Sequence, residues 1–313
     1  MMEKIVAVLV QMALVLALSP LITGFSRTLK ARIQTRRGPG LFQRYRDLHK
    51  LLRKGMVIPD TASWIFTATP YVLFVTTLLA GLLIPAISAQ APLSLFGGVL
   101  AVVYLLALGR FFLALGGLDT GSSFGGLGSS REMTIAAIAE PALMLAVFTV
   151  AIGAGSTNLS MVAQAALGQS WRFLAPAQML AFAALFIVLI AETGRIPVDN
   201  PATHLELTMI HEAMILEYSG FYLALIEWSA AIKQLVLMTL LVNVFFPFGL
   251  SDSWSPAAVG VSLAAFIGKL LLLAVAVVLV ESTNAKLRLF RVPELLAVAF
   301  VLGALALIST FLF

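Results

Sequence analysis

The sequence predicts an all-α integral membrane protein with about eight transmembrane helices in one domain, residues 1–313. Hydrophobic residues make up 60% of the chain and charged residues only 11%, with a mean hydropathy of +1.01. Soluble domains carry about 25% charged residues. Runs of about 20 apolar residues recur along the chain, and each is long enough to cross a bilayer as a helix.

The apolar runs predict eight spans, at residues 4–24, 66–88, 93–115, 132–155, 174–192, 222–246, 257–280 and 294–313. The first run is not expected to be a signal peptide. Its single Lys4 is outweighed by the basic cluster that follows the run, which reverses the charge order of a signal peptide.

The basic residues predict the topology. With eight spans, the loops at 25–65, 116–131, 193–221 and 281–293 share one side of the membrane and hold 15 of the 20 Lys and Arg residues. The opposite side holds Lys4 and Arg172. Cytoplasmic loops are enriched in Lys and Arg, so we expect these loops in the cytoplasm and both termini outside. Topology thus explains the net charge of +5, and no nucleic-acid partner is expected.

A cytoplasmic amphipathic helix is expected near residues 41–54. Leu41, Tyr45, Leu48 and Leu52 fall on one helical stripe, and a basic face with Lys50, Arg53 and Lys54 lies largely opposite. Two interpretations stay open: the helix rests on anionic membrane lipid, or it docks a cytoplasmic subunit.

Several charges fall inside or at the ends of the predicted spans. Glu140, Lys233 and Lys269 are expected near the middle of the membrane, Glu227 lies closer to the cytoplasm, and Glu192 and Glu281 mark cytoplasmic span ends. A charge at the bilayer centre costs about 2.5–3.5 kcal/mol on insertion scales. These groups therefore either form structural ion pairs or make a proton path, with Glu192, Glu227 and Glu140 as a possible chain.

The segment 191–220, AETGRIPVDNPATHLELTMIHEAMILEYSG, holds five of the 15 acidic residues: Glu192, Asp199, Glu206, Glu212 and Glu217. Pro197 and Pro201 interrupt any helix continuing from the fifth span. The many interleaved apolar residues predict a folded, covered loop in which proton affinity can be tuned. No metal site is expected, because the segment lacks an HExxH pattern and a helix would hold His204 and His211 about 10.5 Å apart.

Residues 121–130, GSSFGGLGSS, lack the lysine and the preceding strand of a phosphate-binding loop. We expect a flexible cytoplasmic turn there, with Ser129 or Ser130 as the N-cap of the next span and Glu132 in its first turn. Asp119 and Arg131 are expected to bind a neighbouring subunit.

The chain has no cysteine. It therefore holds no disulfide, no thiolate-bound zinc, no iron–sulfur cluster and no nickel–iron centre of its own. Any redox chemistry has to sit on a partner.

Four motifs carry a resemblance: RRGPG at 36–40, the following YRDLHKLL, GLDTGSSFGGLGSSRE at 117–132 and EYSG at 217–220. Together with the acidic loop, they resemble the membrane subunits of group 4 membrane-bound nickel–iron hydrogenases of the hydrogenase-4 and formate hydrogenlyase type. These are relatives of subunit 1 of respiratory complex I, the NADH dehydrogenase subunit 1 family. The resemblance runs from the first to the last predicted span.

The resemblance implies a non-catalytic subunit of the cytoplasmic (inner) membrane. Hydrogenase-like large and small subunits and an iron–sulfur protein would dock on its cytoplasmic loops and carry the Fe–S clusters and the [NiFe] centre, and antiporter-like membrane subunits would lie beside it. The coupling residues for proton or sodium movement would be Glu140, Glu192, Asp199, Glu206, Glu212, Glu217, Glu227, Lys233 and Lys269. Arg195 would orient the acidic loop by pairing with a carboxylate. Docking residues would be Arg32, Arg36, Arg37, Arg44, Arg46, Asp119 and Arg131.

Two departures from the complex I pattern weaken the case for a quinone. Gly38-Pro39-Gly40 stands where complex I has Gly-Pro-Asn, and Val198 stands where its acidic loop has phenylalanine. The alternatives are a quinone-site subunit of an NADH:quinone oxidoreductase, a stand-alone ion transporter, which inverted repeats would favour, and a passive anchor. His204 and His211 are absent from the complex I pattern and have no assigned role.

Overall fold

A computed structural model describes residues 2–167, 175–200, 209–251 and 256–312. These parts of the chain are all-α and contain no strand, only the isolated bridges Ser88–Ser251 and Gly98–Asn158. Among them, seven helices are long and apolar enough to cross a membrane, and an eighth apolar helix has 17 residues. The predicted all-α membrane fold is confirmed.

The eight helices follow the predicted spans in order: α1 (Met2–Ile33), α3 (Trp64–Leu83), α4 (Val99–Asp119), α5 (Ser123–Ala154), α7 (Pro176–Glu192), α9 (Gly220–Phe245), α10 (Pro256–Thr283) and α11 (Val292–Leu312). Shorter elements join them: α2 (Gln43–Leu52), η1 (Ser94–Phe96), α6 (Leu159–Leu167), α8 (His211–Met214) and η3 (Leu289–Arg291). The exact span count and the side that each terminus faces stay predictions.

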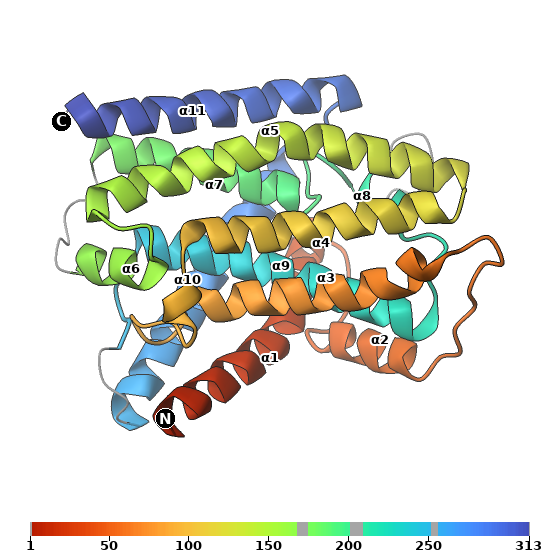
Figure 1. Cartoon of the computed structure of the whole chain (residues 1–313), viewed down its shortest axis with the longest axis horizontal. Helices are drawn as coiled ribbons and strands as arrows, with labels where there is room; N and C mark the ends of the chain where they lie inside the picture. The colour runs from red at the N-terminus through yellow and green to blue at the C-terminus, as the bar shows by residue number, and fades with distance from the viewer. Residues whose placement is uncertain (1, 168–174, 201–208, 252–255, 313) are drawn as a thin grey trace.

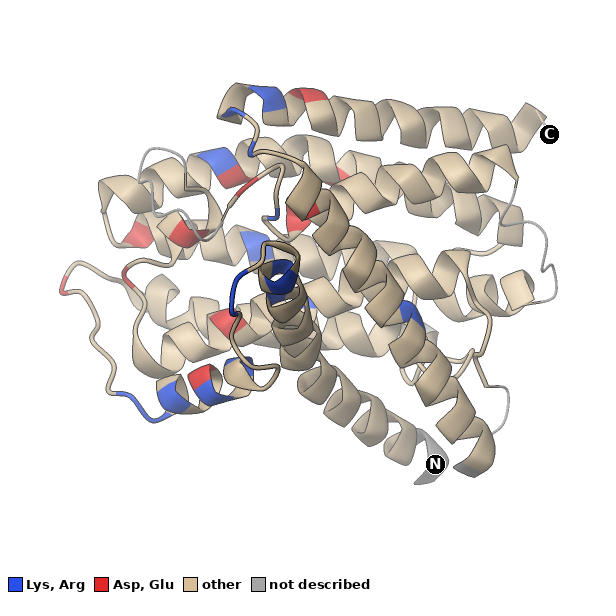
Figure 2. Ribbon diagram, turned by 180° about the vertical axis from the view of Figure 1, so that it is seen from behind, with Lys and Arg blue, Asp and Glu red and all other residues tan. Residues whose placement is uncertain are grey.

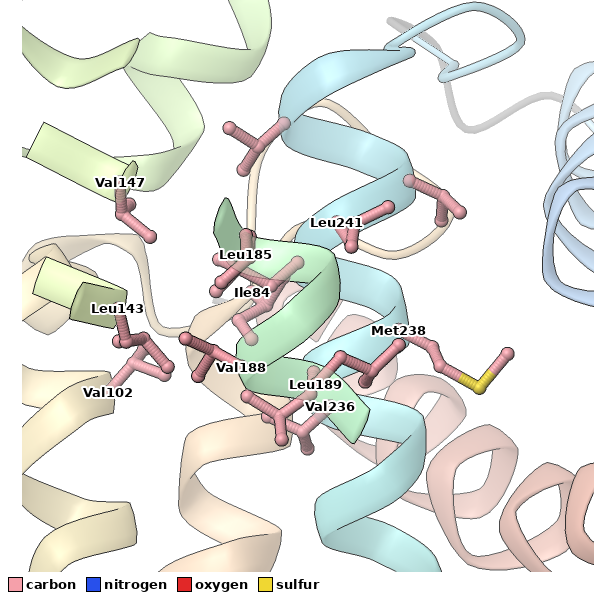
Figure 3. Packing of buried hydrophobic residues seen from close by; sticks show 14 of the residues in the cluster. Ile84, Val102, Leu143, Val147, Leu185, Val188, Leu189, Val236, Met238 and Leu241 are labelled. Carbon is pink, nitrogen blue, oxygen red and sulfur yellow. The ribbon is translucent and has the colours of Figure 1, made fainter. Parts of the chain in front are cut away.

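The bundle is built in layers around α9 (Figure 1). The helices α11, α5 and α7 pack on one another, α3 and α4 pack as a pair, and α1 and α10 diverge on the far side of α9. Buried apolar side chains of α7, such as Leu185 and Val188, meet α9 side chains such as Leu241 in the core (Figure 3). Large apolar side chains of α11 and α1 are exposed, as expected of lipid-facing helices.

The glycine-rich segment is helical, which corrects the predicted flexible turn. Helix α5 begins at Ser123, its N-cap is Ser122, whose hydroxyl accepts a hydrogen bond from the Gly125 amide at 3.1 Å, and Glu132 lies well inside the helix. Ser129 is no cap, because it is buried and its hydroxyl donates to the Ala114 carbonyl at 2.9 Å.

Close packing explains why glycines stand in this helix. A Cβ at Gly128 would lie 2.8 Å from the Ala213 Cβ and 2.9 Å from the Ile210 carbonyl oxygen. On the neighbouring helix α4, a Cβ at Gly117 would lie 3.2 Å from the Met214 Cβ. Glycine lowers the helix propensity of the segment, but it lets α8 and the residue before it rest directly on α4 and α5.

A matched pair of substitutions tests this packing. Gly128→Ala is expected to lower the unfolding temperature in detergent, because overpacking typically costs about 1–3 kcal/mol. A Cβ added at Gly126 would have no neighbouring atom within 4 Å. Gly126→Ala should therefore raise stability slightly, because alanine has a higher helix propensity than glycine. Equal effects of the two changes would contradict the packing explanation.

The predicted amphipathic helix is α2, and part of its apolar stripe packs inside the chain, whereas Leu41 and Leu52 of the stripe are exposed. Leu48 is buried, the Tyr45 hydroxyl donates to the Ala17 carbonyl of α1, and Arg44 pairs with Glu227 of α9. Burial raises the pKa of Tyr45, so this hydroxyl stays a donor. The basic face of α2, including Lys50, is exposed.

The EYSG motif fastens the first loop to α9. The Val57 amide donates to the Ser219 hydroxyl at 2.9 Å, and this hydroxyl donates to the Val57 carbonyl at 3.2 Å. The Tyr218 ring stacks on Phe66 with centroids 4.0 Å apart, and its hydroxyl donates to the Phe66 carbonyl. Burial raises the pKa of Tyr218 far above its usual range, which keeps this hydroxyl protonated. The motif therefore has a structural role here.

Candidate functional site

Charged residues gather in the half of the bundle away from the two termini (Figure 2). One of them is Arg110, in the middle of α4, with a side chain only 5% exposed. Its Nη1 donates to Glu140 at 2.7 Å, its Nη2 donates to Glu192, and its Nε lies 3.6 Å from a Glu132 oxygen.

Four helices build this site. Helix α5 supplies Glu132 and Glu140, and Glu192 is the last residue of α7. From α9, Lys233 reaches Glu192 at 2.8 Å. We call Arg110, Glu132, Glu140, Glu192 and Lys233 the Arg110 cluster. Three carboxylates share two cations, so the cluster carries one negative charge when all five groups are ionised.

Sequence reasoning missed Arg110 and gave Glu132 no role beyond the helix start. The topology count used cations in loops, and Arg110 lies inside the predicted span 93–115. A cation within such a span is itself a functional signal, because its burial in a membrane is costly.

A second group of ion pairs joins α1, α10 and the start of the acidic loop. Glu281 is buried and pairs with Lys30 at 3.0 Å and with Arg195 at 2.7 Å. Arg195 also donates to the Gln234 side chain at 2.8 Å. Arg195 thus does pair with a carboxylate, but the carboxylate is on α10. Asp199 of the loop is buried and pairs with Lys286 at 2.6 Å.

The other predicted coupling residues are more scattered. Glu227 pairs with Arg44 of α2 at 2.8 Å, whereas Glu192 and Glu140 share Arg110, and the chain from Glu192 through Glu227 to Glu140 stays a prediction. Lys269 donates to the Asn243 side chain and the Phe246 carbonyl, at the opposite end of α9. Glu217 is exposed. Glu206 and His204 lie outside the described residues.

The predicted docking residues divide into two groups. Exposed side chains are found at Arg32, Arg36, Arg37 and Arg46. The others are used within the chain. Arg44 holds Glu227, and Arg131 donates to the Met209 carbonyl at 2.8 Å. Asp119 accepts from the Ser63 amide and hydroxyl at 2.7 and 2.6 Å, which fixes the start of α3.

Two adjoining cavities connect these groups. The loop chamber, of about 700 Å³, is bounded by the C-terminal end of α1, the RRGPG segment, the acidic loop and α9. The inner cavity, of about 70 Å³, is lined by Arg110, Glu132, Glu192 and Lys233. Thr193, Gly194, Asp199, His211 and Ala230 line both. Among the described residues, no group of three or more His, Asp and Glu side chains is arranged to hold a metal ion.

Comparisons with known proteins agree with this architecture. Residues 4–312 match the family described as NADH dehydrogenase. The chain is 38% identical to hydrogenase-4 component C of Escherichia coli, over 96% of this chain and 94% of that protein. It is 35% identical to formate hydrogenlyase subunit 4 of the same organism, over 96% and 97%. A chain of the membrane-bound sulfane sulfur reductase, an archaeal respiratory membrane complex, has the same fold, with a TM-score of 0.86 at 20% identity over 98% of this chain and 99% of that one.

Proposed function

The chain belongs to the NADH dehydrogenase family, and from this premise we propose that it is the anchor and ion-coupling subunit of a hydrogenase-type complex in the cytoplasmic (inner) membrane. Its partners would be hydrogenase-like large and small subunits, an iron–sulfur protein and antiporter-like membrane subunits. Electron carriers would sit on those partners, since this chain has no cysteine to ligate clusters or a nickel–iron centre.

The observation that carries the coupling role is the Arg110 cluster. Buried charges within membrane spans are costly and mark ion paths or proton relays. The cluster begins beside the acidic loop, at Glu192, and reaches Glu140 in the middle of α5. A passive anchor has no need for three carboxylates and two cations at this depth.

Glu140 also indicates where the path leads. Its side chain is 35% exposed although it lies in a membrane helix. An ionisable group is not expected to face lipid. We therefore expect a neighbouring membrane subunit to cover Glu140 and to continue the path sideways.

The lining of the loop chamber favours water and ions over a quinone. Six basic and four acidic side chains line it: Arg27, Lys30, Arg36, Arg37, Arg44, Arg195, Asp199, Glu212, Glu227 and Glu281. Pockets that bind apolar organic ligands are lined mostly by hydrophobic and aromatic side chains. Protons can exchange among such charged groups and water.

Purification of the complex in mild detergent tests this function. We expect a co-purifying nickel protein with two Cys-x-x-Cys pairs, hydrogen evolution by the complex, and no inhibition by quinone analogues. Inhibition by such analogues, with a flavin-containing NADH-oxidising partner in place of the nickel protein, would instead support the quinone-reductase alternative. A chain that purifies alone and transports ions would support the transporter alternative.

A further inference from the structure

His211 lies in the wall between the loop chamber and the inner cavity. Of the five residues that line both cavities, only His211 and Asp199 carry an ionisable side chain. Asp199 is already engaged, because it pairs with Lys286 at 2.6 Å and accepts from the Asn200 amide at 2.8 Å. His211 is half-buried, and its side chain forms no hydrogen bond or ion pair with any other described residue.

The backbone holds His211 in this wall. It is the first residue of α8, which rests on Gly117 of α4 and Gly128 of α5. Arg131 donates to the Met209 carbonyl at 2.8 Å, two residues before the histidine. The short helix is thus fixed on α4 and α5, and the imidazole keeps its place between the cavities.

Both sides of the wall present proton donors and acceptors. On the inner side, the cavity is lined by Arg110 of α4, Glu132 of α5, Glu192 of α7 and Lys233 of α9. On the chamber side lie Glu212 of α8, Arg195 and Asp199 of the loop, Glu227 of α9, Glu281 of α10, and Arg27 and Lys30 of α1. The inner cavity has room for a few water molecules.

We propose that His211 is the proton relay between the loop chamber and the Arg110 cluster. A proton from the chamber adds to one ring nitrogen, and the proton on the other nitrogen passes through the inner cavity to a carboxylate of the cluster. Ring rotation then turns the unprotonated nitrogen back toward the chamber and the protonated nitrogen toward the inner cavity, so that the cycle can repeat, and no electron moves. Imidazole suits this role because one of its two nitrogens can accept a proton while the other donates one.

The relay rests on the proposed function and is tested in the same preparation. The complete complex is reconstituted into liposomes of phosphatidylethanolamine and phosphatidylglycerol, and proton uptake is followed during hydrogen evolution. His211→Gln should slow proton uptake about 100-fold, the lower end of a general acid–base contribution. Added imidazole should restore much of the rate, and the subunit composition should be unchanged. His49→Gln, which alters an exposed histidine of α2, should have no effect.

The outcomes separate the two proposals. Normal uptake by His211→Gln, with uptake lost in Glu192→Gln, would overturn the relay and leave the coupling function standing. Normal uptake by both variants would overturn the coupling function itself. Slow uptake that imidazole fails to rescue would assign His211 a purely structural role, and coupled uptake of sodium without protons would also overturn the relay.

Discussion

Replacing Arg110 with leucine is expected to destabilise the chain by about 3–5 kcal/mol, the range for removing one partner of a buried ion pair. The change leaves Glu140 without an ion-pair partner among the described residues, and it leaves Glu192, only 4% exposed, with Lys233 alone. Little assembled complex should then be recovered from membranes. Yield and unfolding temperature of the purified complex measure the effect.

The controls for Arg110 separate loss of pairing from loss of an arginine. Arg288→Leu removes an exposed arginine from the residue before η3, outside the predicted docking residues, and should cost little, since exposed charges contribute little to stability. The triple variant Arg110→Met, Glu140→Gln and Glu192→Gln should recover much of the assembly. In this variant the two residues that bond Arg110 in the wild type no longer carry a charge that needs a partner. Wild-type stability of Arg110→Leu would contradict the pairing described above.

The second large effect is expected from Glu192→Gln. Glutamine keeps the size and a hydrogen-bond acceptor for Arg110 and Lys233, so the complex should assemble. Glutamine cannot take up or release a proton, and the change removes the inner-cavity carboxylate that pairs with Arg110 and Lys233. Ion uptake should therefore stop. Hydrogen evolution should either stop with it or become insensitive to uncouplers.

Glu217→Gln is the comparison for Glu192→Gln. The resemblance gives Glu217 the same role as Glu192, but its side chain is exposed and next to a structural tyrosine. We expect Glu217→Gln to leave most of the ion uptake in place. If the two variants lost the same share of ion uptake, a carboxylate would not need to be buried in the Arg110 cluster in order to take part in coupling.

The sequence predicted the spans well because the partition of a helix into lipid depends on local composition. All eight predicted spans overlap the helices in order, and α2 lies within the predicted stretch 41–54. The glycine-rich start of α5 was missed because its local propensity opposes a helix. Contacts with α8, a helix distant in sequence, override that propensity.

Partners within the site could not be predicted, because pairing depends on which helices are neighbours. Glu140, Lys233 and Lys269 have similar predicted depths, yet Glu140 pairs with Arg110, Lys233 pairs with Glu192, and Lys269 binds Asn243. Hydropathy gives the depth of a residue in a span but not the direction in which its side chain points.

The ratio of ions taken up to hydrogen evolved, measured in sealed liposomes, is the most direct test of the Arg110 cluster as the coupling path. Wild-type complex and the Glu192→Gln complex are compared at matched subunit composition. We predict a fixed, non-zero ratio for the wild type and a ratio near zero for any hydrogen evolution that Glu192→Gln retains. An unchanged ratio in the variant would contradict the claim that ions move through these buried carboxylates.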